Sequence, residues 1–179
     1  MLRGFLLGIV AVLVLLGAGG YVAVKNGVMP ANADATPSAL EKWMARSSLH
    51  ATLAREAPKG PNPLPVTDEN IIAGIKIYAE DCAVCHGDKS KKATAIAAGL
   101  YQKPPQLADD GVEDDPEGVT FWRVKHGIRL TGMPSYSRDL SDKQIWQVSM
   151  FLKHMDKLSP AAQQVWSKVH VNGKDRKQT

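Results

Sequence analysis

Two cysteines that are separated by two residues and followed by a histidine constrain this chain more than any other feature. They lie in the segment Cys82-Ala83-Val84-Cys85-His86, and the 179 residues contain no other cysteine. A zinc site would need further ligands at a usual spacing, and a thioredoxin-like site would need a strand–helix–strand context. The sequence shows neither. A disulfide across two residues would be strained and would leave His86 without a role.

The motif instead predicts the covalent attachment of one haem c. At the end of a helix, two thiols three positions apart can each bond to a vinyl group of the porphyrin. The adjacent His86 imidazole then lies under the iron as an axial ligand. Cys82, Cys85 and His86 are therefore the predicted cofactor-binding residues, and His86 is a predicted metal ligand.

The aromatic content agrees with a core built around a cofactor. The chain has only three Phe, four Trp and four Tyr. A long stretch rich in Gly, Pro and Asp, with only short helical patterns, separates the two strongest predicted helices, so it needs an internal object to fold around. A porphyrin offers several hundred Å² of apolar area, which contributes several kcal/mol at about 25 cal/mol per Å². We therefore expect the domain without haem to be largely unfolded.

The N-terminal segment is long and apolar enough to cross a membrane. Residues 4–24 carry no charge, and at about 1.5 Å per residue they span roughly 30 Å. A cleaved signal peptide is the alternative, although the cleavage-like segment 31–33 lies well beyond the apolar run. We expect a single-pass anchor over residues 1–25 in the bacterial inner membrane, with the haem domain on the periplasmic side.

The charge distribution gives no support for nucleic-acid binding. The formal net charge of +4 falls to +2 once Arg3 and Lys25, which flank the apolar run, are set aside. The other basic residues are scattered rather than gathered on one face. An acidic run opposes them, formed by Asp109, Asp110, Glu113, Asp114, Asp115 and Glu117. No nucleic-acid partner is expected.

The exported part divides into a linker (26–66), a haem domain (67–158) and a C-terminal helix or tail (159–179). In the linker an amphipathic helix is predicted from Ser38 to Ala57, followed by a Pro-rich strap. Its apolar residues are Leu40, Trp43, Met44, Leu49 and Leu53. This region is either a simple spacer or a helix and strap packed on the domain surface.

Two helices frame the predicted haem domain. Thr67 caps the first, whose apolar stripe runs to Cys82. The second is predicted from Asp142 to Leu158, where Ser141 and Gln144 form a capping box at its start. No strand alternation is present, so the predicted fold class is all-α.

These features resemble the class I, mitochondrial-like, monohaem cytochromes c, in a membrane-anchored bacterial form. Gly74 and Tyr78 match the family's glycine and aromatic residue, which pack against the C-terminal helix, and Val148 and Phe151 match the residues that receive them. The resemblance implies a cytochrome c fold, in which N- and C-terminal helices cross around one covalently bound haem.

The resemblance also implies a distal methionine ligand in a loop before the last helix. Met133, followed by Pro134, fits that position, and His126 is the alternative ligand. In the family a proline carbonyl in a Pro-x-Leu stretch accepts a hydrogen bond from the ligating histidine, so Pro105 and Leu107 are predicted site residues. Three further residues are candidates to wall the haem or bind its propionates: Tyr101, Trp122 and Arg129.

Two axial ligands leave the iron no position for a substrate, so the implied function is electron transfer between redox protein partners. No catalysis and no small-molecule substrate are expected. The alternatives are a haem sensor or peroxidase-like enzyme in which Met133 is labile, and a dedicated cytochrome subunit of a larger oxidoreductase. A basic ring around the haem edge is a further hypothesis, formed by Lys89, Lys91, Lys92, Arg123, Lys125 and Arg129. In the tail, Trp166, Lys174, Arg176 and Lys177 are candidate docking residues.

Overall fold

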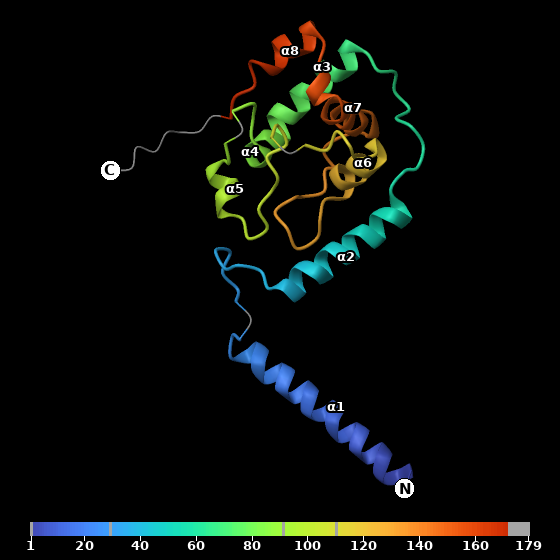
Figure 1. Cartoon of the computed structure of the whole chain (residues 1–179), viewed down its shortest axis with the longest axis vertical. Coiled ribbons are helices and arrows are strands. Elements are labelled where there is room, and N and C mark those ends of the chain that lie inside the picture. The colour runs from blue at the N-terminus through green and yellow to red at the C-terminus, as the bar shows by residue number, and fades with distance from the viewer. Residues whose placement is uncertain (1, 29, 91, 110, 172–179) are drawn as a thin grey trace, which may run out of the picture. The chain divides into compact units, whose positions relative to one another are not determined.

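The structure is a computed structural model of the whole chain, and it describes residues 2–28, 30–90, 92–109 and 111–171. Over these ranges the chain forms helices, turns and loops without a β-strand, so the predicted all-α class is confirmed. The chain separates into two compact units, Met1–Ala35 and Thr36–Thr179 (Figure 1). Five residues named above lie outside the described ranges: Lys91, Asp110, Lys174, Arg176 and Lys177.

The first unit contains one helix, α1 (Leu2–Lys25), in which no residue is buried. Its most apolar window has a mean hydropathy of 2.4, and within the described residues it is the one helix long and apolar enough to cross a membrane. An N-terminal signal sequence has the same length and composition, so the helix is a candidate span only.

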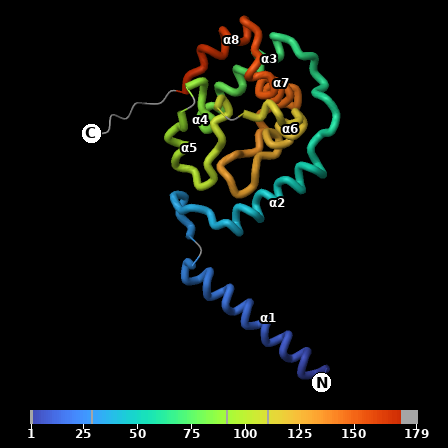
Figure 2. Tube along the Cα trace, viewed as in Figure 1, coloured from blue at the N-terminus to red at the C-terminus, as the bar shows by residue number. Residues whose placement is uncertain are grey.

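The second unit contains the motif and is drawn in Figure 2 as a chain of short helices joined by long loops. A π-helical turn, η1 (Tyr78–Cys82), joins two of the helices, and a 3₁₀ turn, η2 (Met155–Lys157), follows another. The helices are α2 (Ala39–Glu56), α3 (Asp68–Ile77), α4 (Ala83–His86), α5 (Ala95–Gly99), α6 (Glu117–His126), α7 (Asp142–Lys153) and α8 (Pro160–Trp166).

Side-chain caps set where α3 and α7 begin. The Thr67 hydroxyl accepts the Asn70 backbone N–H, and Ser141 with Gln144 forms the predicted capping box. The end of α7 was predicted too late, at Leu158, because His154 leaves the helical conformation with φ −113° and ψ 13°. A separate helix then starts at Pro160, whose fixed φ suits a first helical position.

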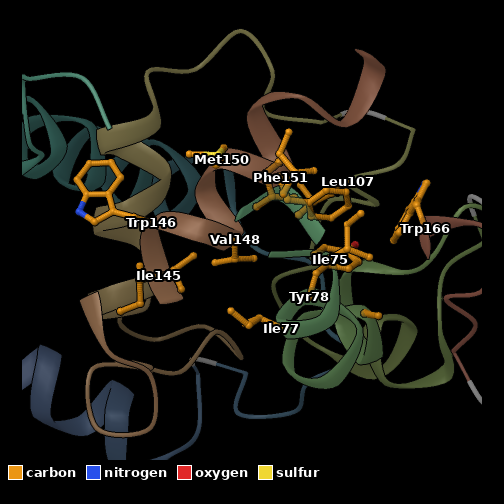
Figure 3. Close-up of a cluster of buried hydrophobic side chains, with 14 of the residues drawn as sticks. Ile75, Ile77, Tyr78, Leu107, Ile145, Trp146, Val148, Met150, Phe151 and Trp166 are labelled. Carbon is orange, nitrogen blue, oxygen red and sulfur yellow. The ribbon is translucent and has the colours of Figure 1, made fainter. Parts of the chain in front are cut away.

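The centre of the unit is the crossing of α3 and α7. Gly74 of α3 lies so close to α7 that a Cβ there would be 2.2 Å from the Gln147 carbonyl oxygen. Beside this contact, Tyr78 and Phe151 are fully buried with ring centroids 5.5 Å apart (Figure 3). The α3–α7 pair therefore builds the rigid frame from which the motif extends.

The segment after α7 completes this core. Trp166 of α8 packs its ring 5.5 Å from that of Tyr78 and 5.2 Å from that of Phe151. Two polar contacts fasten the chain around α8: Lys89 donates to the Ser167 carbonyl at 2.6 Å, and the Val171 N–H donates to Asp88 at 2.9 Å. Trp166, proposed from the sequence as a docking residue, is instead buried in the core.

Acid should loosen this C-terminal fastening, because it depends on an ionised, buried Asp88. Burial alone would raise the pKa of Asp88, but hydrogen bonds from Ser90 and Val171 outweigh it and lower the pKa below its usual range. A lowered folded-state pKa contributes stability that is complete above the unfolded-state value, about 3.9, and is lost as the pH falls below it. Because unprotected amides also exchange more slowly in acid, the quantity to measure is the protection factor of the Val171 amide in hydrogen exchange, which we expect to fall below about pH 4.

The variant Asp88→Asn should exchange this amide faster at neutral pH and show a flatter pH dependence than the parent. Asp114→Asn, at an exposed position, is the matched control and should behave like the parent. Equal pH dependence in the Asp88→Asn variant and the parent would show that Asp88 does not control this segment.

Helix α2 packs against the rest of the second unit, but not through the predicted apolar face. Leu53 and Ala57, which caps the end of the helix, are buried, whereas Leu40, Trp43 and Met44 are exposed. The prediction of a single apolar face was wrong, because these leucine, tryptophan and methionine residues lie on the side of α2 opposite to Leu53. The Pro-rich strap packs on α6, since a Cβ on Gly118 would lie 2.1 Å from the Pro58 carbonyl oxygen.

Candidate haem-binding site

The two thiols lie on a single turn of chain that leaves the α3–α7 frame. Cys82 ends η1 and Cys85 lies in α4, and both cysteines are free. Burial raises the pKa of Cys82 to about 12, with a smaller contribution from the Asp81 carboxylate. The Cys82 thiol is therefore neutral at physiological pH, and its partly buried position in the apolar core favours a bond to an apolar porphyrin edge.

Gly87 ends α4 and lets another segment approach the motif. It has a φ of +75°, which favours glycine, and a Cβ there would lie 2.3 Å from Gln106 Oε1. The Tyr78 hydroxyl donates to the Gly87 carbonyl at 2.8 Å and ties this turn to the core. Gln106 in turn donates from Nε2 to the Cys85 carbonyl at 3.3 Å.

His86 is held in one orientation and one tautomer. Its Nδ1 lies 2.9 Å from the Pro105 carbonyl oxygen, and because a carbonyl only accepts, Nδ1 carries the proton. The Leu107 N–H donates back to the His86 carbonyl at 3.2 Å. Burial lowers the pKa of His86, although the Pro105 hydrogen bond opposes the shift. The result is a neutral imidazole whose Nε2 has the lone pair that a metal needs.

Met133 lies in a loop that is closed at its base. The Ile128 N–H donates to the Met133 carbonyl at 3.2 Å. Gly127 has a φ of +67°, and a Cβ there would lie 2.6 Å from the Pro134 carbonyl carbon. Leu130 at the loop tip also has a positive φ of 63°, which a non-glycine residue rarely adopts. The loop is thus a tightly constrained element rather than a free connection.

A hydrogen bond connects the Met133 loop to the thiol turn. The Tyr136 hydroxyl donates to the Asp81 carbonyl at 2.9 Å, directly before Cys82. Met133 and Tyr136 are partly buried and pack against the same apolar cluster as Cys82. The fold therefore bonds a thioether-bearing loop to the turn that carries Cys82.

The other predicted site residues have different surroundings. Leu107 is buried in the core. The Tyr101 hydroxyl donates to the Glu41 carboxylate of α2 at 2.8 Å, and the Trp122 ring lies 4.9 Å from that of His126. Arg129 is exposed. The Tyr101 hydroxyl is thus bonded to a protein carboxylate.

Two members of the basic ring proposed from the sequence are neutralised by ion pairs. Arg123 pairs with Asp115 at 2.6 Å and Lys125 pairs with Asp142 at 2.7 Å, while Lys89 is bound to the Ser167 carbonyl. Lys92 and Arg129 remain exposed in the described part of the chain. The positive charge available to steer an acidic partner is therefore smaller than the six basic residues of the sequence suggest.

Three residues that shape the site were not singled out from the sequence. Gln106 supports Cys85, Tyr136 joins the Met133 loop to the thiol turn, and Glu41 binds Tyr101 from α2. Tyr136 follows the Met-Pro pair closely, which is a local signal. Gln106 and Glu41 bond to residues far away along the chain, and no local sequence pattern predicts these contacts.

The residues present fit haem c. Two free thiols and a neutral, oriented imidazole lie on one turn, and a methionine loop is bonded to that turn. These residue types are the ones that hold a covalently attached haem. The site and the all-α frame define the class of protein: a domain that carries haem c.

Comparisons with known proteins agree with this class. Residues 69–152 match the family described as cytochrome c oxidase, cbb3-type, subunit III. The thiosulfate dehydrogenase of Stutzerimonas stutzeri is 30% identical over 71% of this chain and 42% of its own length. The quinohemoprotein alcohol dehydrogenase ADH IIB of Pseudomonas putida is 26% identical over 51% of this chain and 12% of its own.

A chain of the reducing HAO-like protein complex of Kuenenia stuttgartiensis is 24% identical, with a TM-score of 0.42 over 56% of this chain and 52% of the other. The present chain spans less than half the length of the two dehydrogenases. Residues 69–152 form a monohaem, class I-like cytochrome c domain. Haem c is its cofactor, and its role is haem-based electron transfer.

Proposed function

We propose that the chain is a membrane-tethered, monohaem electron carrier in which His86 and Met133 are the axial ligands. It works on the periplasmic side of the bacterial inner membrane and passes electrons between redox protein partners. When bound, the haem supplies a one-electron iron couple. The chain itself binds no small-molecule substrate and catalyses no reaction.

The hydrogen bond between His86 Nδ1 and the Pro105 carbonyl carries this proposal. It fixes the tautomer that presents Nε2 to a metal, and it increases the basicity of the ring. Pro105 thereby positions the proximal ligand without contacting the metal itself. A free, switching histidine would not need this fixed acceptor.

The closed Met133 loop supports the choice of distal ligand. Its base is bonded through Ile128 and Gly127 packs against Pro134, so the Met133 backbone is held in place. If Met133 and His86 both held the haem iron, the methionine would raise its reduction potential and no coordination position would be left open. Both properties suit a carrier rather than an oxygen- or peroxide-activating enzyme.

The relatives favour a dehydrogenase as one redox partner. Both are named as dehydrogenases, and the similarity to this chain covers only part of each. A cytochrome domain of this kind can be fused to a dehydrogenase or can bind to one as a separate subunit. In both arrangements the cytochrome lies next to the dehydrogenase. The membrane tether is α1, whose apolar run is long enough to span a bilayer.

The variant Met133→Ala tests the distal ligand. We expect the reduced variant to bind carbon monoxide rapidly at neutral pH and to have a lower reduction potential, because a ligand position is opened. Met155→Ala, at a partly buried methionine in η2, is the control and should bind carbon monoxide as slowly as the parent. Rapid binding by the parent itself would favour the sensor or peroxidase-like function, and an unchanged Met133→Ala variant would favour His126 as the ligand.

A further inference from the structure

The side of α2 that points away from its packed face carries large apolar residues that the haem site does not use. Leu40, Trp43 and Met44 are 62%, 65% and 51% exposed. At about 100° per residue they share one side of the helix with small residues. We define the outward face of α2 as Leu40, Trp43, Met44, Ser47, Ala51 and Ala54. The two glutamates of the helix lie off this face.

The opposite side of α2 is fixed to the haem-binding unit. Leu53 is buried, and the Glu41 carboxylate accepts a hydrogen bond from Tyr101. Just beyond the helix, the Pro58 carbonyl lies against Gly118 of α6. Helix α2 cannot rotate to bury its outward face without breaking these contacts. The outward face is therefore a fixed feature of the surface.

The charge next to the outward face is positive. Arg46, about 60° from Trp43 around the helix, is exposed and has no ion pair among the described residues, whereas Lys42 lies on the side of Leu53. The acidic residues are already engaged, Glu41 with Tyr101 and Glu56 with Arg55 at 2.7 Å. An apolar face with a tryptophan, bordered by a free arginine, matches the boundary of an anionic bilayer, where tryptophan and basic side chains are favoured.

The chain itself limits how far this face can lie from a membrane. Helix α1 ends at Lys25 and α2 begins at Ala39. The residues between them, 26–38, reach at most about 45 Å when fully extended. A bilayer that holds α1 is therefore a surface at high local concentration for α2.

We propose that the outward face of α2 binds the surface of an anionic phospholipid bilayer and holds the haem-binding unit beside the membrane. The inference rests on the proposed membrane tether, and it adds a second, interfacial attachment. Trp43 and its apolar neighbours enter the boundary between headgroups and acyl chains. Arg46 contacts lipid phosphates. The docked face keeps the orientation of the haem-binding unit fixed relative to the bilayer.

Vesicle flotation tests the proposal with the haem-loaded fragment 36–179. This fragment is a separate compact unit, and α1 has no buried residue. We expect it to float with vesicles of phosphatidylglycerol and phosphatidylethanolamine, as read by Soret absorbance, and to float less at high salt. The triple variant L40S/W43S/M44S should lower the ratio of bound to free protein about ten-fold or more.

Val66→Ser, another exposed apolar position, is the matched control and should float like the parent fragment. Three results would overturn the proposal: no flotation of the parent, equal flotation of the triple variant, or a dimer that the triple variant abolishes without flotation. The last result would assign the face to a second copy of the chain. Because the fragment lacks α1 and its haem spectrum is read separately, none of these results touches the tether or the electron-transfer proposal.

Discussion

The double variant Cys82→Ala, Cys85→Ala should lose its native fold together with its haem. Native domains are stable by only about 5–15 kcal/mol. Covalent haem contributes several kcal/mol of apolar burial at about 25 cal/mol per Å², and the loops that hold Pro105 and Met133 would lose their central packing partner. We expect poorly dispersed NMR spectra and no cooperative thermal transition, measured by near-UV circular dichroism.

A substitution at an exposed position of the same motif is the control. It distinguishes the effect of losing haem from the effect of changing the sequence of the motif. Val84 is 40% exposed, and the variant Val84→Ala keeps both thiols and His86. This variant should therefore retain haem and fold normally. A double-cysteine variant that gives native-like, well-dispersed spectra without haem would contradict the claim that this domain folds around its cofactor.

The second large effect is expected at the helix crossing. In Gly74→Ala the new methyl group would lie 2.2 Å from the Gln147 carbonyl oxygen and 2.9 Å from Phe151 Cβ. Backbone cannot move aside as a flexible side chain does, so α3 and α7 must separate. We expect a loss of about 3 kcal/mol in the free energy of unfolding, measured by guanidinium denaturation of the haem-loaded protein.

Gly99→Ala provides the control for the same chemical change. Gly99 also lies in a helix, α5, but a Cβ there would meet nothing within 4 Å. Alanine is the better helix former, so this variant should be neutral or up to about 1 kcal/mol more stable. Equal effects of the two substitutions would show that Gly74 does not mark a close crossing.

The parts of the fold that follow local rules were predictable from the sequence. Thr67 and Ser141 cap the starts of α3 and α7, as their side-chain types and the apolar periodicity that follows them predict. The all-α class follows from the helical periodicity and the absence of strand alternation, and the haem c cofactor follows from the Cys82–His86 motif; both are confirmed. The assignment of axial and supporting ligands stays a prediction, although His86 and Pro105 are bonded in the geometry that the assignment requires.

What the sequence could not provide are contacts between distant segments. The apolar residues of α2 suggest one packed face, but Tyr101 and α6 hold the helix by its other side and leave Trp43 exposed. Trp166 looks like a tail residue until α8 places it against Tyr78. Ion pairs such as Arg123 with Asp115 neutralise a basic group that looked free in sequence. In each case the partner lies far away along the chain.

The far-red absorption spectrum of the oxidised protein tests the central claim most directly. If His86 and Met133 are the two axial ligands, the spectrum contains the charge-transfer band between methionine sulfur and ferric iron. This band should persist at neutral pH and disappear in Met133→Ala. An oxidised protein without the band would contradict the account. Rapid carbon monoxide binding after reduction would then identify an open metal site in place of an electron carrier.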